Sequence, residues 1–186
     1  MAGVKFDVTS NIQQKVAQIK EALTHQQPLF AELNEYLLRI HRARFKRQES
    51  PDGEKWQALS PAYARRKHRN KDKVLTFRGH LQGTLRGVYD DTSLAFGTDR
   101  VYGAIHQFGG TIKRRARQHT LYFRQGRDGS VGNQFVNKGK SNFSQRANIG
   151  AYTITMPQRR WLGVSSDERT DIVTKTMNYL DAAAKR

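Results

Sequence analysis

The chain has 186 residues and a mass of 21.3 kDa, which suits one domain with an extension. It contains no cysteine, which excludes disulfides, thiolate metal sites and cysteine nucleophiles and fits a reducing compartment. Its 33 Lys and Arg against 16 Asp and Glu give a net charge of +17, which favours polyanions or acidic protein surfaces as partners. No apolar run is long enough to span a membrane and the N-terminus lacks a signal-peptide pattern, so we expect no membrane partner.

The N-terminal part predicts a short strand and two helices. Val4, Phe6 and Val8 alternate with polar residues, as in a half-buried strand. The first helix follows Ser10 or Asn11, with an apolar stripe of Ile12, Val16, Ile19 and Leu23. The second runs from about residue 28 to about residue 46, with a stripe of Leu33, Leu37 and Ile40. Its cationic end is interpreted as a solvated face, with a partner contact as the alternative, and comprises Arg39, Arg42, Arg44, Lys46 and Arg47.

The middle of the chain predicts turns, a short helix and a hairpin. Residues 48–53 form a turn cluster, after which Trp56 and Leu59 are expected to pack on the core. Ser60 and Pro61 predict the start of a short helix over residues 61–68, followed by an exposed basic loop. Residues 88–96 predict a tight hairpin around Asp90 and Asp91.

The stretch of residues 102–110 predicts one helical turn. Tyr102, Ile105 and Phe108 recur every three residues and predict its apolar side, with His106 and Gln107 on the polar side. Gly109 and Gly110 then end the turn, because glycine readily adopts the left-handed conformation. We interpret His106 as a hydrogen-bonded structural histidine, with a catalytic base as the alternative.

Residues 111–160 carry eleven Lys or Arg against one acid, Asp128. Residues 121–123 and 152–155 predict strands that pair at the base of a long hairpin, whose polar tip buries too little apolar surface to order alone. We therefore divide the chain into a body, residues 1–112 and 157–186, and an inserted basic arm, residues 113–156. The expected contacts of the arm with DNA or an acidic partner are Lys113, Arg114, Arg115, Arg117, Arg124 and Arg127.

The C-terminal pattern predicts a last helix. Ser165 and Glu168 have capping-box spacing, and Ile172, Val173, Met177 and Leu180 predict its buried stripe. The fold class expected from these elements is α+β: N-terminal and C-terminal helices packed on a small, mostly antiparallel sheet, with an inserted basic β-hairpin arm.

The sequence offers little support for an enzyme. No pair of histidines has metal-binding helical spacing, and neither a phosphate-binding glycine loop nor a nucleophile elbow occurs. We expect no cofactor, no metal and no catalysis. A sequence-nonspecific nucleic-acid-binding protein is the alternative, because basic and aromatic residues interleave in the arm. A metal nuclease that uses Asp52, Glu54 and Lys55 is a distant third.

An ordered series of motifs carries a resemblance to a known family. It consists of Arg44-Phe45, Ser50-Pro51-Asp52-Gly53 with Trp56, Leu59 and Ser60, Leu75-Thr76 with Gly79 and Leu81, His106-Gln107-Phe108-Gly109-Gly110 after Tyr102 and Ala104, and Pro157 with Arg159 and Trp161-Leu162-Gly163. This series resembles the virion morphogenesis, or tail completion, proteins of Mu-like and P2-like contractile-tailed bacteriophages. The resemblance implies a non-enzymatic structural protein at the head–tail junction that assembles as a ring and joins the tail to the head.

The resemblance also implies partners and a location. The partners would be further copies in a ring, expected to be a hexamer, the neighbouring head-completion or connector proteins, the tail terminator or tail tube proteins, and DNA in the lumen. The location would be the virion neck or tail, and the host cytoplasm during assembly. We expect the motif residues to set turns, fill the core or form a subunit interface; they are Trp56, His106, Gln107, Phe108, Gly109, Gly110, Pro157, Arg159 and Trp161.

Overall fold

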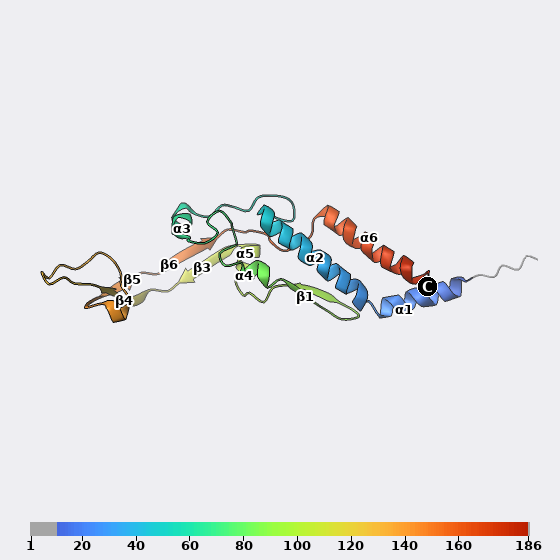
Figure 1. Ribbon diagram of the computed structural model, residues 1–186, viewed down its shortest axis with the longest axis horizontal. Helices are drawn as coiled ribbons and strands as arrows, with labels where there is room; N and C mark the ends of the chain where they lie inside the picture. Colours follow the sequence, from blue (N-terminus) through green and yellow to red (C-terminus); the bar gives the residue numbers. More distant parts are fainter. Residues whose placement is uncertain (1–10, 186) are drawn as a thin grey trace, which may run out of the picture. The chain divides into compact units, whose positions relative to one another are not determined.

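The computed structural model describes residues 11–185 (Figure 1). The strand predicted at Val4, Phe6 and Val8 lies outside the described residues. The chain forms two compact units: residues up to 108 together with those from 157 onward make the first, and residues 109–156 make the second. The fold class is α+β, as predicted, but the strands form separate two-stranded antiparallel ladders instead of one sheet.

The first unit is built mainly from helices. These are α1 (Ile12–Thr24), α2 (Gln27–Arg47), α3 (Pro61–Arg66), α4 (His80–Gly83), α5 (Gly103–Phe108) and α6 (Ser166–Ala183). Pro28 lies in the first turn of α2, and the side chain of Ser60 caps α3 by accepting from the backbone N–H of Tyr63. Helix α2 contacts α6 and the hairpin, and α1 contacts α6 (Figure 1).

The hairpin of the first unit consists of β1 (Arg86–Tyr89) and β2 (Leu94–Gly97). The carboxylate of Asp90 accepts hydrogen bonds from the backbone N–H groups of Thr92 and Ser93, and these bonds fix the turn. The same bonds hold the pKa of Asp90 below its usual range. The predicted hairpin is confirmed, and Asp90 has a structural role in its turn.

The apolar stripes predicted for the two terminal helices are not buried as expected. No residue of α1 is fully buried, and Val16 is 58% exposed. On α6, Val173 and Met177 were predicted to be buried, yet Met177 is 53% exposed. The hydroxyl of Tyr179 on α6 lies 3.3 Å from the carbonyl of Ala22 and 2.8 Å from that of His25, and α6 also contacts α2. The apolar sides of α1 and α6 are therefore only partly covered.

The second unit consists of two successive ladders. Strand β3 (Gly110–Arg114) pairs with β6 (Tyr152–Met156), and β4 (Arg117–Phe123) pairs with β5 (Phe143–Ile149). The predicted pairing of residues 121–123 with residues 152–155 is wrong. Strand β5 was missed because its polar centre, Ser-Gln-Arg, lacks the apolar alternation that marks a strand.

The loop between β4 and β5 has more internal structure than its composition predicted. It contains the short 3₁₀ helix η1 (Lys138–Lys140). The side chain of Asn142 accepts from the backbone N–H of Gln125 and donates to its carbonyl, at 2.7 and 2.8 Å. The rings of Phe123 and Phe135 pack with centroids 5.3 Å apart. Local hydrogen bonds and an aromatic contact thus connect the two ends of this loop to each other and to β4.

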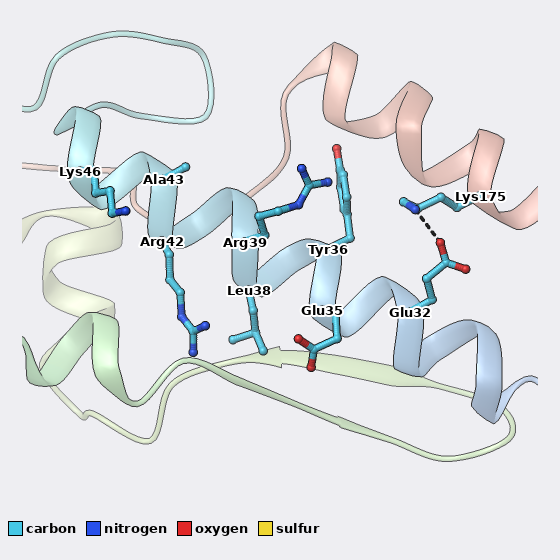
Figure 2. A pocket seen from close by; sticks show the side chains of 9 residues that line it. All are labelled: Glu32, Glu35, Tyr36, Leu38, Arg39, Arg42, Ala43, Lys46 and Lys175. Atoms are coloured by element: carbon cyan, nitrogen blue, oxygen red, sulfur yellow. Dashed lines mark hydrogen bonds and ion pairs between the residues drawn. The ribbon is translucent and has the colours of Figure 1, made fainter.

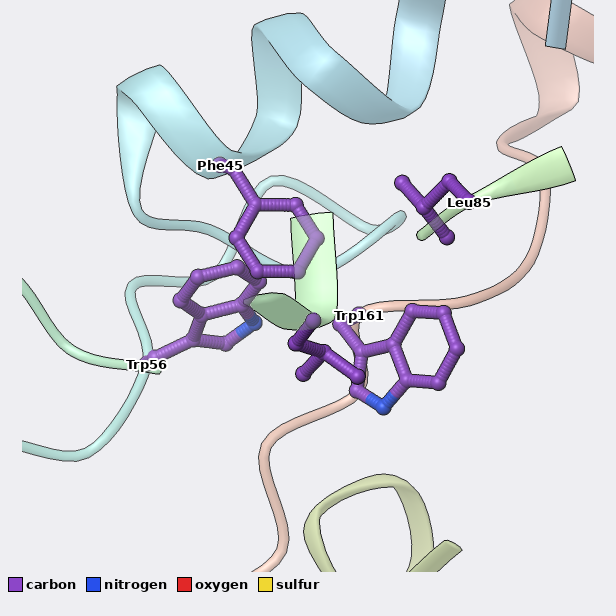
Figure 3. Packing of buried hydrophobic residues seen from close by; sticks show 5 residues of the cluster. Phe45, Trp56, Leu85 and Trp161 are labelled. Carbon is purple, nitrogen blue, oxygen red and sulfur yellow. The ribbon is translucent and has the colours of Figure 1, made fainter. Parts of the chain in front are cut away.

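The core of the first unit lies where α2 ends. It comprises Phe45, Trp56, Leu81, Leu85 and Trp161 (Figure 3). The rings of Phe45 and Trp56 meet edge to face, with centroids 5.2 Å apart and planes at 72°, an arrangement that aromatic quadrupoles favour. The predicted core positions of Trp56 and Trp161 are confirmed.

A buried ion pair joins α2 to α6 beside this core. The guanidinium of Arg44 is 1% exposed and donates to both carboxylate oxygens of Glu168, at 2.7 and 3.0 Å. It also donates to the carbonyl of Gly163 at 2.8 Å. The interpretation of Arg44 as part of a solvated cationic helix end is therefore wrong. Glu168 also completes the predicted capping box with Ser165, which is confirmed.

His41 lies one turn before Arg44 and is also buried. Its Nδ1 lies 2.7 Å from the carbonyl of Leu37, and its Nε2 lies 3.4 Å from the backbone nitrogen of Gly163. A neutral ring that donates through Nδ1 and accepts through Nε2 satisfies both contacts. Burial lowers the pKa of His41 to about 4, and the positive charge of Arg44 acts in the same direction.

The Arg44–Glu168 pair predicts a large and specific loss of stability. In the variant Glu168→Gln the side chain keeps its shape and its capping ability, but the charge of Arg44 is left buried without a counter-charge. We expect the free energy of unfolding, measured by denaturant titration, to fall by about 3–5 kcal/mol. The control is Glu32→Gln, which breaks the more exposed pair with Lys175 and should cost at most about 1 kcal/mol. Equal losses in the two variants would contradict the structural role of the buried pair.

The depressed pKa of His41 predicts a loss of stability in mild acid. The folded chain binds a proton at His41 less tightly than the unfolded chain does. The neutral ring therefore contributes fully to the free energy of unfolding above the ordinary pKa of 6.5, and this contribution is lost as the pH falls toward 4. Between pH 7 and pH 5 we expect a loss of about 2 kcal/mol in the free energy of unfolding. His41→Gln should remove this part of the pH dependence, whereas the exposed-site variant His119→Gln should retain it. A parallel pH profile for His41→Gln and the wild type would refute the assignment.

Candidate functional site

Most of the predicted motif residues meet where helix α5 lies against residues 157–163, which we call the return segment. Gln107 makes the densest contacts. Its side-chain oxygen accepts from the backbone N–H groups of Trp161 and Leu162, at 3.0 and 2.9 Å, and its amide donates to the carbonyl of Leu162 at 2.9 Å. One side chain therefore satisfies three backbone groups, as a neighbouring strand would do.

The two tryptophans fix the same segment from either side. The indole N–H of Trp56 donates to the carbonyl of Arg160 at 2.8 Å, and that of Trp161 donates to the carbonyl of Gly103 at 3.0 Å. A Cβ on Gly103 would lie 3.2 Å from the ring of Trp161, so a side chain at this position would crowd the indole. Both indoles combine burial with a satisfied donor, which buried tryptophan requires.

Arg159 binds backbone carbonyls of a distant segment. Its guanidinium is buried and donates to the carbonyls of Gln57 and Ala58, at 2.8 and 3.1 Å. Its backbone N–H donates to the carbonyl of His106 at 2.7 Å. Burial lowers the pKa of this guanidinium. Arg159 therefore ties the return segment to residues 57–58 and to α5 together.

His106 does not match its predicted hydrogen bonding. Its ring packs edge-on against Tyr102, and its Nδ1 is buried without a hydrogen-bond partner in the part of the chain that the structure describes. Burial and the nearby charge of Arg159 lower its pKa, so the ring is neutral at pH 7. The ring contributes packing, and its backbone carbonyl makes the contact with Arg159.

Helix α5 presents the side opposite to the one that its apolar spacing predicted. Phe108 was expected in the core or at an interface, but its side chain is 74% exposed, so the core reading is wrong. Gln107 and Gly103 face inward instead, because the return segment offers backbone groups that a polar side chain can satisfy. Gly109 and Gly110 have φ of 70° and 139° and end the helix, as predicted. Pro157 is half-buried at the start of the return segment.

Sequence reasoning missed the buried role of Arg44 and of Lys67. Lys67 is buried at the end of α3 and donates to the carbonyl of Lys73, and burial lowers its pKa. For Arg44 a signal was available. It falls four residues after Ile40 and so continues the apolar stripe of Leu33, Leu37 and Ile40 on the same side of the helix.

A hollow of about 590 Å³ lies along α2 and reaches Lys175 of α6 (Figure 2). Its acids lie toward the N-terminal end of the helix and its bases toward the C-terminal end; it is lined by Glu32, Glu35, Tyr36, Leu38, Arg39, Arg42, Ala43, Lys46 and Lys175. The hydroxyl of Tyr36 donates to Asp171 at 2.7 Å, and burial together with this bond raises its pKa to about 12. Lys175 forms an ion pair with Glu32 (Figure 2). These contacts connect α2 with α6, and the hollow is part of the helix packing.

The basic residues predicted for the arm are all exposed in the second unit. Lys113 and Arg114 lie on β3 and Arg117 on β4, whereas Arg115, Arg124 and Arg127 lie outside the strands. The side chain of Arg124 donates to the carbonyl of Lys140. Within residues 11–185, none of the six forms an ion pair with a carboxylate.

The acidic residues of the nuclease hypothesis have other contacts. Asp52 forms an ion pair with Arg160 of the return segment. The backbone N–H of Glu54 donates to the hydroxyl of Ser50, within the turn. In the described part of the chain, no three His, Asp or Glu side chains are grouped so that they could hold a metal ion. No helix among the same residues is both long enough and apolar enough to cross a bilayer.

The contacts of Gln107 predict a measurable role in stability. Gln107→Ala should leave three half-buried backbone groups of the return segment without partners, at a cost of about 1–3 kcal/mol. Thermal and denaturant unfolding should show this loss. Gln158→Ala is the control within the return segment, because Gln158 is exposed. If both variants unfold alike, the amide of Gln107 does not hold the return segment.

Comparisons with known proteins agree with the motifs that converge here. The sequence pattern of the Phage virion morphogenesis family matches residues 7–181. The chain is 31% identical over 112 residues to "Mu-like prophage FluMu G protein 1" of Haemophilus influenzae, covering 58% of this chain and 75% of that protein. No solved structure matches the chain. Because the family pattern covers nearly the whole sequence, including every motif of the return segment and α5, this chain belongs to the phage virion morphogenesis family.

Proposed function

We propose that this chain is a structural protein of the virion neck, which assembles as a homo-oligomeric ring and joins the tail to the head. Its membership of the phage virion morphogenesis family supports a role in building the particle. The motif residues support a structural role, since Gln107, Arg159 and Trp161 use their polar groups on the protein's own backbone. Groups bound in this way are not free to act on a substrate.

The observation that carries the ring proposal is the incomplete burial of α1 and α6. Val16 and Leu23 on α1, and Val173 and Met177 on α6, are each at least half exposed. Two helices that contact each other thus both present apolar side chains to the solvent. Apolar surface gathered on adjacent elements marks a contact surface, and a second copy of the chain is the occupant that a ring requires.

A ring requires two different contact surfaces on each subunit. A cyclic assembly larger than a dimer joins two different patches on each subunit, head to tail. Phe108, Val101 and Tyr102 form a second set of exposed apolar side chains around α5, away in sequence from both terminal helices. We propose a hexamer, with head-completion or connector proteins and tail terminator or tail tube proteins as its neighbours.

The mass of the purified protein in solution tests this proposal. Light scattering or native mass spectrometry should give a single multiple of 21.3 kDa. The double variant Val16→Glu with Met177→Glu should fall to monomer, because charges in a subunit interface lose their hydration. The matched control, Gln14→Glu with Asn178→Glu, changes exposed polar positions on the same two helices and should keep the wild-type mass.

A second measurement places the protein in the particle. Quantitative mass spectrometry of purified virions should find the chain at a fixed small copy number that matches the ring. The Val16→Glu, Met177→Glu variant should yield unjoined heads and tails when it replaces the wild type. Complete particles that lack the chain would overturn the proposal.

A further inference from the structure

Residues 109–156 carry a concentrated positive charge that the protein itself leaves uncompensated. They contain nine Lys or Arg side chains against one acid, Asp128, a net charge of +8. All nine side chains are exposed, and none forms an ion pair within the described residues. Asp128 binds the hydroxyl and backbone N–H of Ser130 in a turn. Such a unit attracts a polyanion strongly.

The register of the ladders shows how these charges are distributed. Successive residues of a strand point to opposite faces, and directly paired residues share a face. Lys113 and Arg114 are adjacent on β3 and therefore lie on opposite faces of the β3–β6 ladder. In the β4–β5 ladder, Arg146 pairs with Thr120 and therefore shares its face. Arg117 lies three residues before Thr120 on the same strand, and an odd separation places it on the opposite face. Each ladder thus carries cations on both faces.

Cations on both faces favour a partner that surrounds the ladder. A flat acidic protein surface would be met by one face, and charges on the other face would stay in water. The major groove of duplex DNA admits a two-stranded β-ribbon and presents a wall of phosphates on each side of it. This second arrangement uses both sets of side chains.

The ring of Phe123 is engaged within the unit and is not free to stack on a base. A single strand is held by bases that stack on free aromatic rings. Here the ring of Phe123 already packs against Phe135 and Phe143, with centroids 5.3 and 6.5 Å apart. Phe123 is therefore used within the protein, whereas Phe135 is 71% exposed. The preference for a duplex follows from the cations on both faces of the ladders.

We propose that residues 109–156 bind duplex DNA without sequence preference, with a β-ladder in the major groove and its cations contacting phosphates on both walls. This interaction goes beyond the proposed ring and does not depend on it, because it uses the second unit alone. It would place the basic unit on DNA whether the chain is monomeric or assembled.

The test measures binding of the full chain to a fluorescent random-sequence duplex over a series of salt concentrations. Four variants each remove one exposed cation: Lys113→Gln, Arg114→Gln, Arg117→Gln and Arg146→Gln. Together they remove one cation from each face of each ladder. Each should weaken binding and reduce the slope of log affinity against log salt by about 0.9. The control variants Lys20→Gln and Arg169→Gln remove exposed cations of the first unit and should leave the slope unchanged.

Two competitors distinguish the alternatives. A duplex whose major groove is filled by glucosylated cytosines should compete poorly, and poly-glutamate should compete poorly at equal charge. The proposal is overturned if poly-glutamate competes as well as DNA, since the unit then suits an acidic protein. It is equally overturned if the variants on only one face of a ladder reduce the slope, or if the control variants reduce it as much as the others. Binding of groove-filled DNA as tightly as ordinary DNA would also overturn it.

Discussion

The buried guanidinium of Arg44 is the constraint on which the rest of the first unit depends. A charge with 1% exposure is tolerated only if its donors are satisfied and a counter-charge lies beside it. Glu168 supplies that charge from 124 residues away, and the carbonyls of Trp161 and Gly163 take further donors. The C-terminal part of the chain, which follows the second unit in the sequence, must therefore return to the end of α2. This contact places the start of α6 beside the end of α2, while Gln107 and the carbonyl of Gly103 hold Trp161.

The return segment shows how irregular backbone can be buried without a strand partner. Its N–H and carbonyl groups are satisfied by Gln107, by the indole of Trp56 and by the backbone of His106. The side chain of Arg159, which belongs to the return segment, donates in turn to the carbonyls of residues 57 and 58 outside it. Polar residue types at these positions thus bind the protein's own backbone.

The two units differ in the surface that they offer. The first unit exposes apolar side chains on α1 and α6, whereas the second exposes cations on both faces of its ladders. Apolar surface suits contact with protein, and unpaired cations suit a polyanion. The proposed ring contact and the proposed DNA contact therefore use separate residues, and each surface can be altered without touching the core.

The sequence by itself determined the α+β class, the approximate bounds of α2, the start of α6, a hairpin over residues 88–96, the capping box and the family resemblance. Each of these depends on local signals: apolar spacing, capping residues, prolines and glycines, and ordered motifs. Only the tertiary structure decided that Arg44 is buried, that Phe108 points outward, that Met177 is exposed, and that β4 pairs with β5. Burial and strand pairing depend on which distant segment arrives, and spacing along one element cannot specify this. The sequence alone does not show that Glu168 lies beside Arg44 and supplies its counter-charge. It also does not show whether residues 121–123 pair with residues 143–145 or with residues 152–155.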